Sequence, residues 1–173
     1  MYMATLDIIM LSNTINHEIY KMTQHALKTL KESIGRKDFK IILVETNKDL
    51  DLTYDDADVV LKPGIPFNYN TYLNLAAEHC VGDYTCIVNN DVNFHKDWWY
   101  KMEKAMDKHN LDTASPRSPT LQNGIVPHAE IKHRFTPETT VRVGFELIIN
   151  FCGWCWVMKK EVKDWIFPLD EQF

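Results

Sequence analysis

The sequence is poor in glycine, cysteine and long apolar runs, and each shortage excludes a class of protein. Six glycines and seven prolines in 173 residues exclude collagen-like and low-complexity chains. Four cysteines are too few for a disulfide scaffold in a chain of this length. No apolar run approaches the roughly 18 residues that span a bilayer, so no transmembrane helix is expected.

The N-terminus also lacks the features of a secretory signal, namely a basic region and a cleavage site of small residues. We therefore expect a cytoplasmic protein whose cysteines are reduced thiols. A basic excess is missing as well, because 19 lysines and arginines stand against 24 aspartates and glutamates, for a net charge of −5. Nucleic acid is therefore not an expected partner, although a local basic patch stays open.

Short apolar runs and helical periodicities alternate along the first 110 residues of the chain. The apolar runs predict buried strands at 6–11, 39–44, 59–61 and 84–88. Apolar residues at helical spacing predict helices at 19–34 and 69–79 and a third from residue 98 onward. Such alternation predicts an α/β fold, with a mostly parallel sheet flanked by helices in a single domain.

Local signals mark the helix starts and the last third of the chain. Asn16 or Thr14 is expected to cap the first helix, and Asp97 the third. Residues 113–140 carry four prolines and many polar residues, which predicts long loops. Residues 144–157 form a long apolar stretch that predicts one or two strands, and 161–165 predict a short helix.

Polar residues directly follow three of the predicted strands. They are Ser12-Asn13-Thr14, Glu45-Thr46-Asn47 and Asn89-Asn90-Asp91. Ligands of parallel α/β sheets bind beyond the carboxyl ends of the strands, so three polar clusters there predict a nucleotide-sized site. A carboxylate flanked by amides also suits Mg²⁺ or Mn²⁺, which typically shares one or two carboxylates with substrate phosphates. The other interpretation of Asn89-Asn90-Asp91 is a turn, for which these residues are well suited.

Residues 82–91, GDYTCIVNND, resemble the segment that leads into the metal-binding acidic motif of family 2 glycosyltransferases, which have the GT-A fold. In that family a Gly-Asp-Tyr precedes an apolar strand and then Asn-Asn-Asp or Asp-x-Asp. Residues 67–76 resemble the family's helix start rich in Phe and Asn, and residues 153–162 its acceptor-side strand and helix. Residues 167–173, FPLDEQF, resemble its Phe-Asp-Glu-x-Phe segment. The resemblance covers most of the chain in the family's order.

The resemblance implies an enzyme that moves a sugar from a nucleotide-diphosphate sugar, expected to be a UDP-sugar, to a hydroxyl acceptor with inversion. Residues 1–110 would form the nucleotide-sugar-binding part and residues 111–173 the acceptor-side part. Asp91 would hold Mn²⁺ or Mg²⁺. Six residues are expected to contact the donor: Ser12, Asn13, Thr14, Glu45, Asn89 and Asn90. The small size and the apolar C-terminal third also suggest a homo-oligomer.

The chain departs from the family at two points. Residues 63–70 lack the glycine pair that is common near the helix start of the relatives. Many relatives also carry a further acidic pair shortly after the Phe-Asp-Glu-x-Phe segment, where it supplies the catalytic base, whereas this chain stops at Phe173. The base is then expected to be Asp170 or Glu171, because an inverting transfer needs a group that takes the proton of the acceptor hydroxyl. The alternative that this sequence is a truncated domain stays open.

Three other functions are alternatives to this one. A nucleotidyltransferase would need glycine and lysine in a phosphate loop after the first strand, and residues 11–14, LSNT, contain neither. Cys152 and Cys155 form a C-x-x-C, but in a strand they would point to opposite faces, which favours structural thiols over a redox pair. The main alternative is a non-catalytic module that binds nucleotide sugars or glycans and lacks the base.

Overall fold

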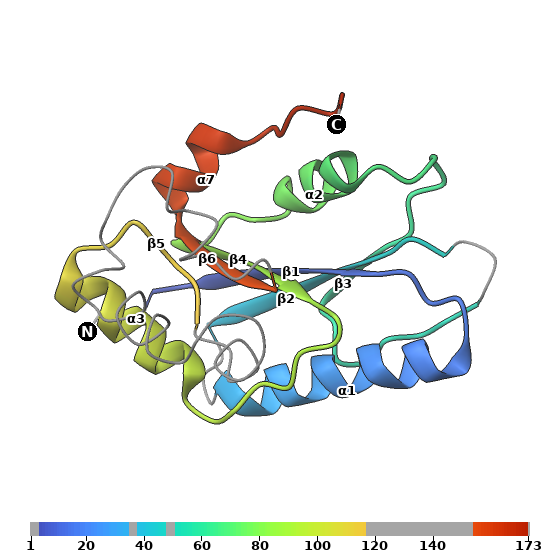
Figure 1. Ribbon diagram of the computed structural model, residues 1–173, viewed down its shortest axis with the longest axis horizontal. Coiled ribbons are helices and arrows are strands. Elements are labelled where there is room, and N and C mark those ends of the chain that lie inside the picture. Colours follow the sequence, from blue (N-terminus) through green and yellow to red (C-terminus); the bar gives the residue numbers. More distant parts are fainter. Residues whose placement is uncertain (1–3, 35–37, 48–50, 117–153, 173) are drawn as a thin grey trace, which may run out of the picture.

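The computed structural model describes residues 4–34, 38–47, 51–116 and 154–172. They form a six-stranded sheet with the strand order β3-β2-β1-β4-β6-β5 (Figure 1). The strands are β1 (Leu6–Ser12), β2 (Phe39–Glu45), β3 (Val59–Leu61), β4 (Tyr84–Asn89), β5 (Thr113–Ala114) and β6 (Cys155–Lys159). The first four strands pair in parallel, whereas β6 runs antiparallel to both β4 and β5. The predicted α/β fold with a mostly parallel sheet is confirmed.

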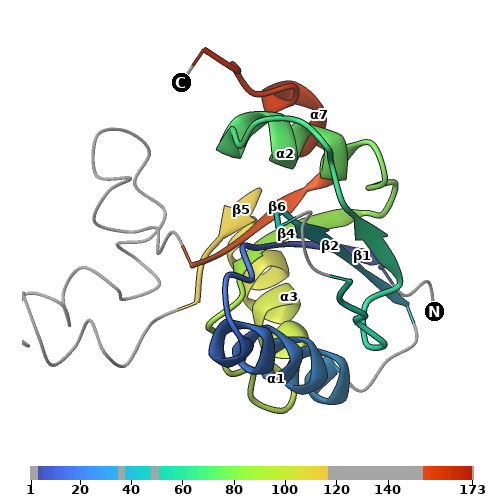
Figure 2. The same ribbon diagram turned by 90° about the vertical axis from the view of Figure 1, so that its right-hand side faces the viewer.

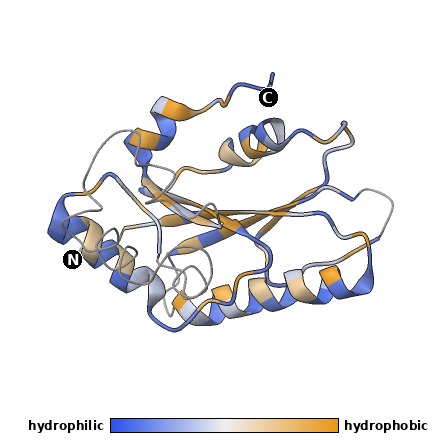
Figure 3. Cartoon of the chain, viewed as in Figure 1, coloured by the Kyte–Doolittle hydropathy of each residue, from blue (hydrophilic) through white to orange (hydrophobic). Residues whose placement is uncertain are grey.

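Helices cover both faces of the sheet. One face carries α1 (His17–Ile34) and α3 (Trp98–His109), and the other carries α2 (Tyr69–Ala77) and α7 (Lys160–Ile166) (Figures 1 and 2). Because successive strand residues point to opposite faces, Ile8 packs in the core with α1 and α3, whereas Ile9 packs in the core with α2. Figure 3 shows the apolar strands between helices that carry hydrophilic residues on their outer surfaces. Within the described ranges no helix is long and apolar enough to cross a membrane.

The helix α1 illustrates how the sequence produces these layers. Its apolar stripe, which includes Leu27 and Leu30, is buried against the sheet, whereas the lysines of the helix, Lys21, Lys28 and Lys31, are exposed. At its start the Oδ1 atom of Asn16 accepts a hydrogen bond from the main-chain N–H of Ile19 at 3.0 Å. Asn16 therefore caps the helix, and the alternative cap, Thr14, has other partners.

Two local expectations are wrong. Asp97 occupies the N-cap position of α3, but its backbone is left-handed with φ of 64° and its side chain makes no capping hydrogen bond. The residues Thr113–Ala114, expected in a loop, form β5, because pairing with β6 defines a strand too short to show a periodicity. Residues 117–153 lie outside the described residues, and with them most of the predicted loops, the start of the 144–157 stretch and Cys152.

The cysteines that the structure describes are buried, free thiols, as expected: Cys80, Cys86 and Cys155. Burial raises the pKa of the Cys80 thiol to about 12 and holds the pKa of Cys86 well above its usual value. A thiol is reactive only as the thiolate, so these two groups are inert members of the core.

Candidate functional site

The predicted polar clusters meet at one edge of the sheet. In the parallel ladders Ser12 lies beside Glu45, and Leu11 lies beside Asn89. The segments after β1, β2 and β4 therefore leave the sheet together, at the edge where the chain passes from β1 into α1 (Figure 1). Parallel strands joined by helices end at the same edge, which is where ligands of such sheets bind.

Glu45 is the centre of a buried hydrogen-bond network at this edge. The residue has 0% exposed surface, and its carboxylate accepts four hydrogen bonds. Its Oε1 atom accepts from the main-chain N–H of Thr14 at 3.0 Å and of Asn47 at 2.8 Å. Its Oε2 atom accepts from the hydroxyls of Thr14 at 2.8 Å and Tyr54 at 2.5 Å. The loop after β1 is thereby tied to the loop after β2.

Tyr54 is a member of this network that the sequence analysis missed. Its side chain is 5% exposed and belongs to the core on the α1 side of the sheet. Burial raises the pKa of Tyr54, and the hydrogen bond to the Glu45 carboxylate raises it further, so the phenol stays protonated as a donor. The available signal was an aromatic residue inside the acidic, polar stretch 51–58.

A second chain of hydrogen bonds joins β1, β4 and α1. The Oγ atom of Ser12 lies 3.1 Å from the Thr14 hydroxyl and 3.0 Å from the Thr23 hydroxyl. Asn90 donates from Nδ2 to the Thr23 hydroxyl at 2.9 Å. Ser12, Thr14 and Asn90 thus share one network with Glu45, as their positions after the strands predicted. The sequence analysis did not identify Thr23. The sequence feature that could have indicated it is a threonine among the apolar residues of the helix, and this threonine is buried in α1.

The other predicted residues at this edge, Asn13, Asn89 and Asp91, are exposed. In the part of the chain that the structure describes, Asp91 makes no hydrogen bond or ion pair. Carboxylate and amide oxygens are hard donors, and Mg²⁺ or Mn²⁺ completes such a set with waters and phosphate oxygens. Asp91 and its neighbouring amides therefore fit a shared cation site, although the described residues contain no cluster of three acidic, histidine or cysteine side chains.

The predicted acidic pair is held against α2. Asp170 and Glu171 are exposed, and the side chains of three asparagines of α2 and its cap contact their segment: Asn68, Asn70 and Asn74. Because α2 follows β3, its first turn lies at the carboxyl edge of the sheet. After α7 the chain crosses above α2 toward this edge (Figure 1).

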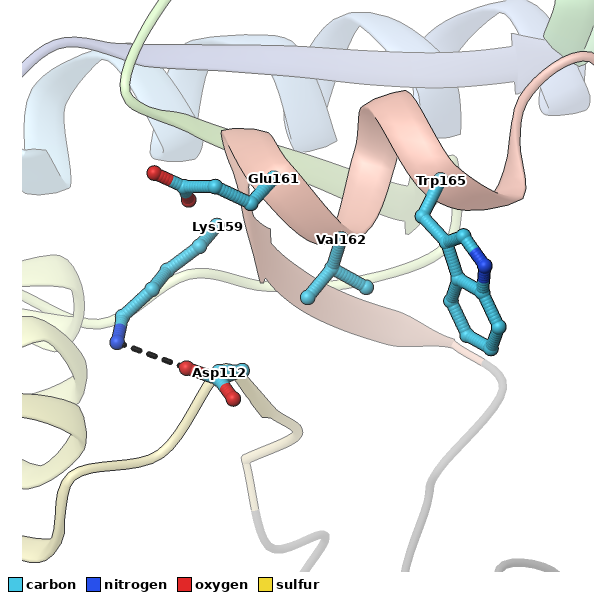
Figure 4. Close-up of a pocket in the computed structure, with 5 residues that line it drawn as sticks. All are labelled: Asp112, Lys159, Glu161, Val162 and Trp165. Atoms are coloured by element: carbon cyan, nitrogen blue, oxygen red, sulfur yellow. Dashed lines mark hydrogen bonds and ion pairs between the residues drawn. The ribbon is translucent and has the colours of Figure 1, made fainter.

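A pocket of about 480 Å³ lies elsewhere, beside β6 and α7. It is lined by Asp112, Lys159, Glu161, Val162 and Trp165, and Figure 4 shows Lys159 turned toward Asp112, with 2.9 Å between Nζ and Oδ1. Lys159 pairs with Tyr84 at the start of β4, whereas Asn89 ends that strand. The pocket is therefore at the opposite end of the sheet from the Glu45 network.

Comparison with protein families gives a match over most of the chain. The profile described as Glycosyl transferase family 2 covers residues 14–166. The chain belongs to glycosyl transferase family 2. The resemblance seen in the sequence is thereby confirmed. No curated protein sequence matches this family 2 chain.

Solved structures share the fold of this glycosyl transferase family 2 chain. The mannosyltransferase PcManGT from Pyrobaculum calidifontis, in complex with GDP-Man and Mn²⁺, has a TM-score of 0.71 and 14% identity, over 96% of this chain and 47% of that one. S. aureus TarS 1–349 in complex with UDP has a TM-score of 0.70 and 15% identity, over 97% of this chain and 51% of that one. The chain spans about half the length of both, and the shared fold is that of GT-A glycosyltransferases.

Proposed function

We propose that this chain binds a nucleotide-diphosphate sugar, with UDP as the nucleotide, and transfers the sugar to a hydroxyl acceptor with inversion, in the cytoplasm. The observation that carries the proposal is the network of Ser12, Glu45 and Asn90 at the same edge as the exposed carboxylate of Asp91. Two neighbours with the same fold are complexes with GDP-Man and Mn²⁺ and with UDP, which supports this donor class.

Within this proposal, the six residues that are predicted to contact the nucleotide sugar fall into an exposed group and a more buried group. Asn13 and Asn89 are exposed and would present their amides to the donor directly. The other four, Ser12, Thr14, Glu45 and Asn90, are largely enclosed in mutual hydrogen bonds and would line the floor of the site while holding its loops in place. A site of this kind is preorganised, because its polar groups have fixed directions before the ligand arrives.

The transfer has two chemical requirements. The negative charge on the departing diphosphate must be compensated, and the acceptor hydroxyl must lose its proton. Asp91 would hold the Mn²⁺ or Mg²⁺, and the cation supplies charge stabilisation to the departing diphosphate. Asp170 or Glu171, exposed at the same edge, would take the proton of the acceptor hydroxyl. Residues 111–173 would face the acceptor, and self-association of the chain would complete that side.

Thermal unfolding with nucleoside diphosphates tests the donor site. A ligand at about 100 times its dissociation constant adds roughly 2.7 kcal/mol, which raises Tm by about 5–10 °C for a domain of this size. We expect this shift with UDP and Mn²⁺, a much smaller one without Mn²⁺, and none in Asp91→Ala. Asp107→Ala, which removes an exposed acid on α3, is the matched control and should respond like the native chain.

Hydrolysis of the donor separates the enzyme from the binding module. Release of UDP from a UDP-sugar by the native chain, with water as acceptor, supports transfer. If UDP raised Tm but the chain released no nucleoside diphosphate from UDP-glucose, UDP-GlcNAc or GDP-mannose, the result would instead indicate the non-catalytic module. If no nucleoside diphosphate raised the Tm of the native chain, the proposal would be overturned.

A further inference from the structure

An exposed tryptophan lines the pocket beside β6 and α7, away from the carboxyl edge of the sheet. The side chain of Trp165 is 85% exposed, whereas that of Trp99 on α3 is 1% exposed. Glu161 and Val162 lie four and three positions before Trp165 on α7, so the three side chains share one side of the helix. A single exposed apolar residue is ordinary on a protein surface, but an indole in a pocket of about 480 Å³ offers a ligand a flat apolar wall.

The other end of the pocket is formed by a fixed pair of opposite charges. Asp112 immediately precedes β5 and Lys159 ends β6, and the main-chain N–H of Lys159 donates to the main-chain oxygen of Asp112 at 2.9 Å. Their side chains are joined as well, with 2.9 Å between Nζ and Oδ1. Figure 4 shows Val162 between Lys159 and Trp165, with these three side chains projecting to the same side. The pocket therefore combines an apolar floor, an indole and an ion pair.

The ion pair can still make hydrogen bonds in both directions. An ammonium carries three hydrogens, and Lys159 directs one of them to Asp112. The side chain of Asp112 is 70% exposed, and carboxylate oxygens accept from several donors at once. Glu161 adds a further acceptor to the lining. Two carboxylates against one ammonium give the pocket a negative charge, which disfavours anionic ligands such as phosphate.

These features select a neutral ligand with an apolar face and hydroxyl groups at its rim. A pyranose ring has this form, because its C–H groups make a flat apolar face and each of its hydroxyls both donates and accepts. The indole of Trp165 covers the apolar face. A donor held beside an acceptor, as in Lys159 and Asp112, then satisfies a hydroxyl in both of its roles.

We propose that the pocket between Trp165 and the Asp112–Lys159 pair binds a saccharide, and that it is separate from the site for the nucleotide sugar. The ring would stack on the indole while its hydroxyls contact the ion pair. The pocket lies at the opposite end of the sheet from the Glu45 network, so a saccharide held there leaves the carboxyl edge open. Binding at the pocket needs neither nucleotide nor cation, and the inference therefore does not depend on the proposed transfer.

Isothermal titration calorimetry with cellotetraose, chitotetraose and mannotetraose, in the absence of nucleotide and metal, tests this site. The protein is kept dilute enough for light scattering to show a single copy, so that no second copy covers the indole. We expect at least one of the three to bind the native chain. Trp165→Ala should then raise its Kd by about 10-fold or more, because the stacking surface is lost. Lys159→Met, which keeps the apolar stem and removes the ammonium, should raise Kd by about 10-fold.

Tyr100→Ala and Lys160→Met are the matched controls. Tyr100 is a half-exposed aromatic residue of α3, on the other face of the sheet. Lys160 is the neighbour of Lys159 and stands outside the lining of the pocket. Both variants should bind the oligosaccharide as the native chain does. Because its side chain is largely exposed, Trp165→Ala should keep the native Tm and the rise in Tm with UDP and Mn²⁺.

The outcomes separate this site from the proposed function. An unchanged Kd in Trp165→Ala, an equal loss in Tyr100→Ala, or no binding of any of the three oligosaccharides would overturn the inference. Displacement of the oligosaccharide by UDP and Mn²⁺ would place it at the carboxyl edge and overturn the inference too. So would uridine that bound more tightly than the oligosaccharides and was lost in Trp165→Ala, since the pocket would then bind a nucleobase. If UDP and Mn²⁺ left Tm unchanged while the oligosaccharide bound, only the proposed function would fail.

Discussion

The carboxylate of Glu45 has no contact with solvent, yet it accepts four hydrogen bonds from two loops and a distant tyrosine. Replacing Glu45 by Ala would leave those donors buried without an acceptor. An unsatisfied buried group costs about 1–3 kcal/mol, and some donors will recover water, so we expect a loss of about 3 kcal/mol. Urea unfolding followed by circular dichroism measures it.

The control for this loss is Glu32→Ala. Glu32 is an exposed residue of α1 that pairs with Lys28 at 4.0 Å, and surface pairs of this kind contribute about 0–1 kcal/mol. If Glu45→Ala were no more destabilising than Glu32→Ala, the network would not hold the loops as described.

Tyr54 makes the stability of the same network depend on pH. Its pKa in the folded chain is raised, whereas an unfolded tyrosine ionises near pH 10. The contribution of Tyr54 is therefore complete below about pH 10 and is lost as the pH rises above it, at about 1.4 kcal/mol per pH unit. Urea unfolding between pH 10 and 11.5 should give a slope that is smaller in Tyr54→Phe than in the native chain by about 1.4 kcal/mol per pH unit, because the raised pKa values of Cys80 and Cys86 add a slope that both chains share. Tyr100→Phe, at a half-exposed position, should keep the native slope.

At the scale of single elements, the start of α1 is decided by a side chain outside the helix. Within the described residues, Asn16 supplies the only side-chain hydrogen bond to an N–H in the first turn of α1. Asn16→Ala should cost about 1 kcal/mol of unfolding free energy, whereas Asn16→Ser should retain most of it, because serine is an equally good cap. Equal stability of the two variants would contradict a capping role.

The helix α2 contacts the sheet through one set of side chains and the segment after α7 through another. Tyr72, Leu73 and Ala76 pack on the sheet and fix the helix in place. Asn70 and Asn74 extend from the same helix to the segment after α7. Residues 169–171 lie in no strand or helix, and their hydrogen bonds to α2 hold them in place relative to the sheet.

At the scale of the whole molecule, the two ends of the sheet differ in kind. The carboxyl edge carries the polar network and Asp91, and the opposite end carries the pocket beside Trp165. Trp165 is 85% exposed and Val81 is 74% exposed, and Lys163 joins their segments by donating to the Cys80 oxygen at 2.9 Å. A large exposed aromatic side chain beside a pocket is a candidate contact for association between copies.

This surface predicts the oligomeric state. Light scattering should give the native chain a mass above the 20.3 kDa of one copy, and Trp165→Ser should return it to the monomer. Ile65→Ser removes an exposed apolar residue at a different place and should leave the native mass unchanged. A monomeric native chain at working concentration would contradict self-association through this surface.

The strands and helices that place the site could be predicted because their signal is local. Runs such as Ile41–Val44 are apolar because both faces of a parallel strand are buried, and a polar residue after such a run marks the end of the strand. Glu45 and Asn90 were identified in this way. Thr113–Ala114 could not be, since two residues become a strand only by pairing with β6.

The sequence by itself determined the α/β class, the family and the sheet edge at which the polar residues gather, because these depend on residue type and spacing along the chain. Only the tertiary structure decided which side chains meet there. Tyr54 and Thr23 reach Glu45 and Ser12, and Asn74 reaches Glu171, through strand order, register and helix packing. A hydrogen bond forms over about 3 Å, and the distance between two residues that far apart in the chain is set by the whole fold.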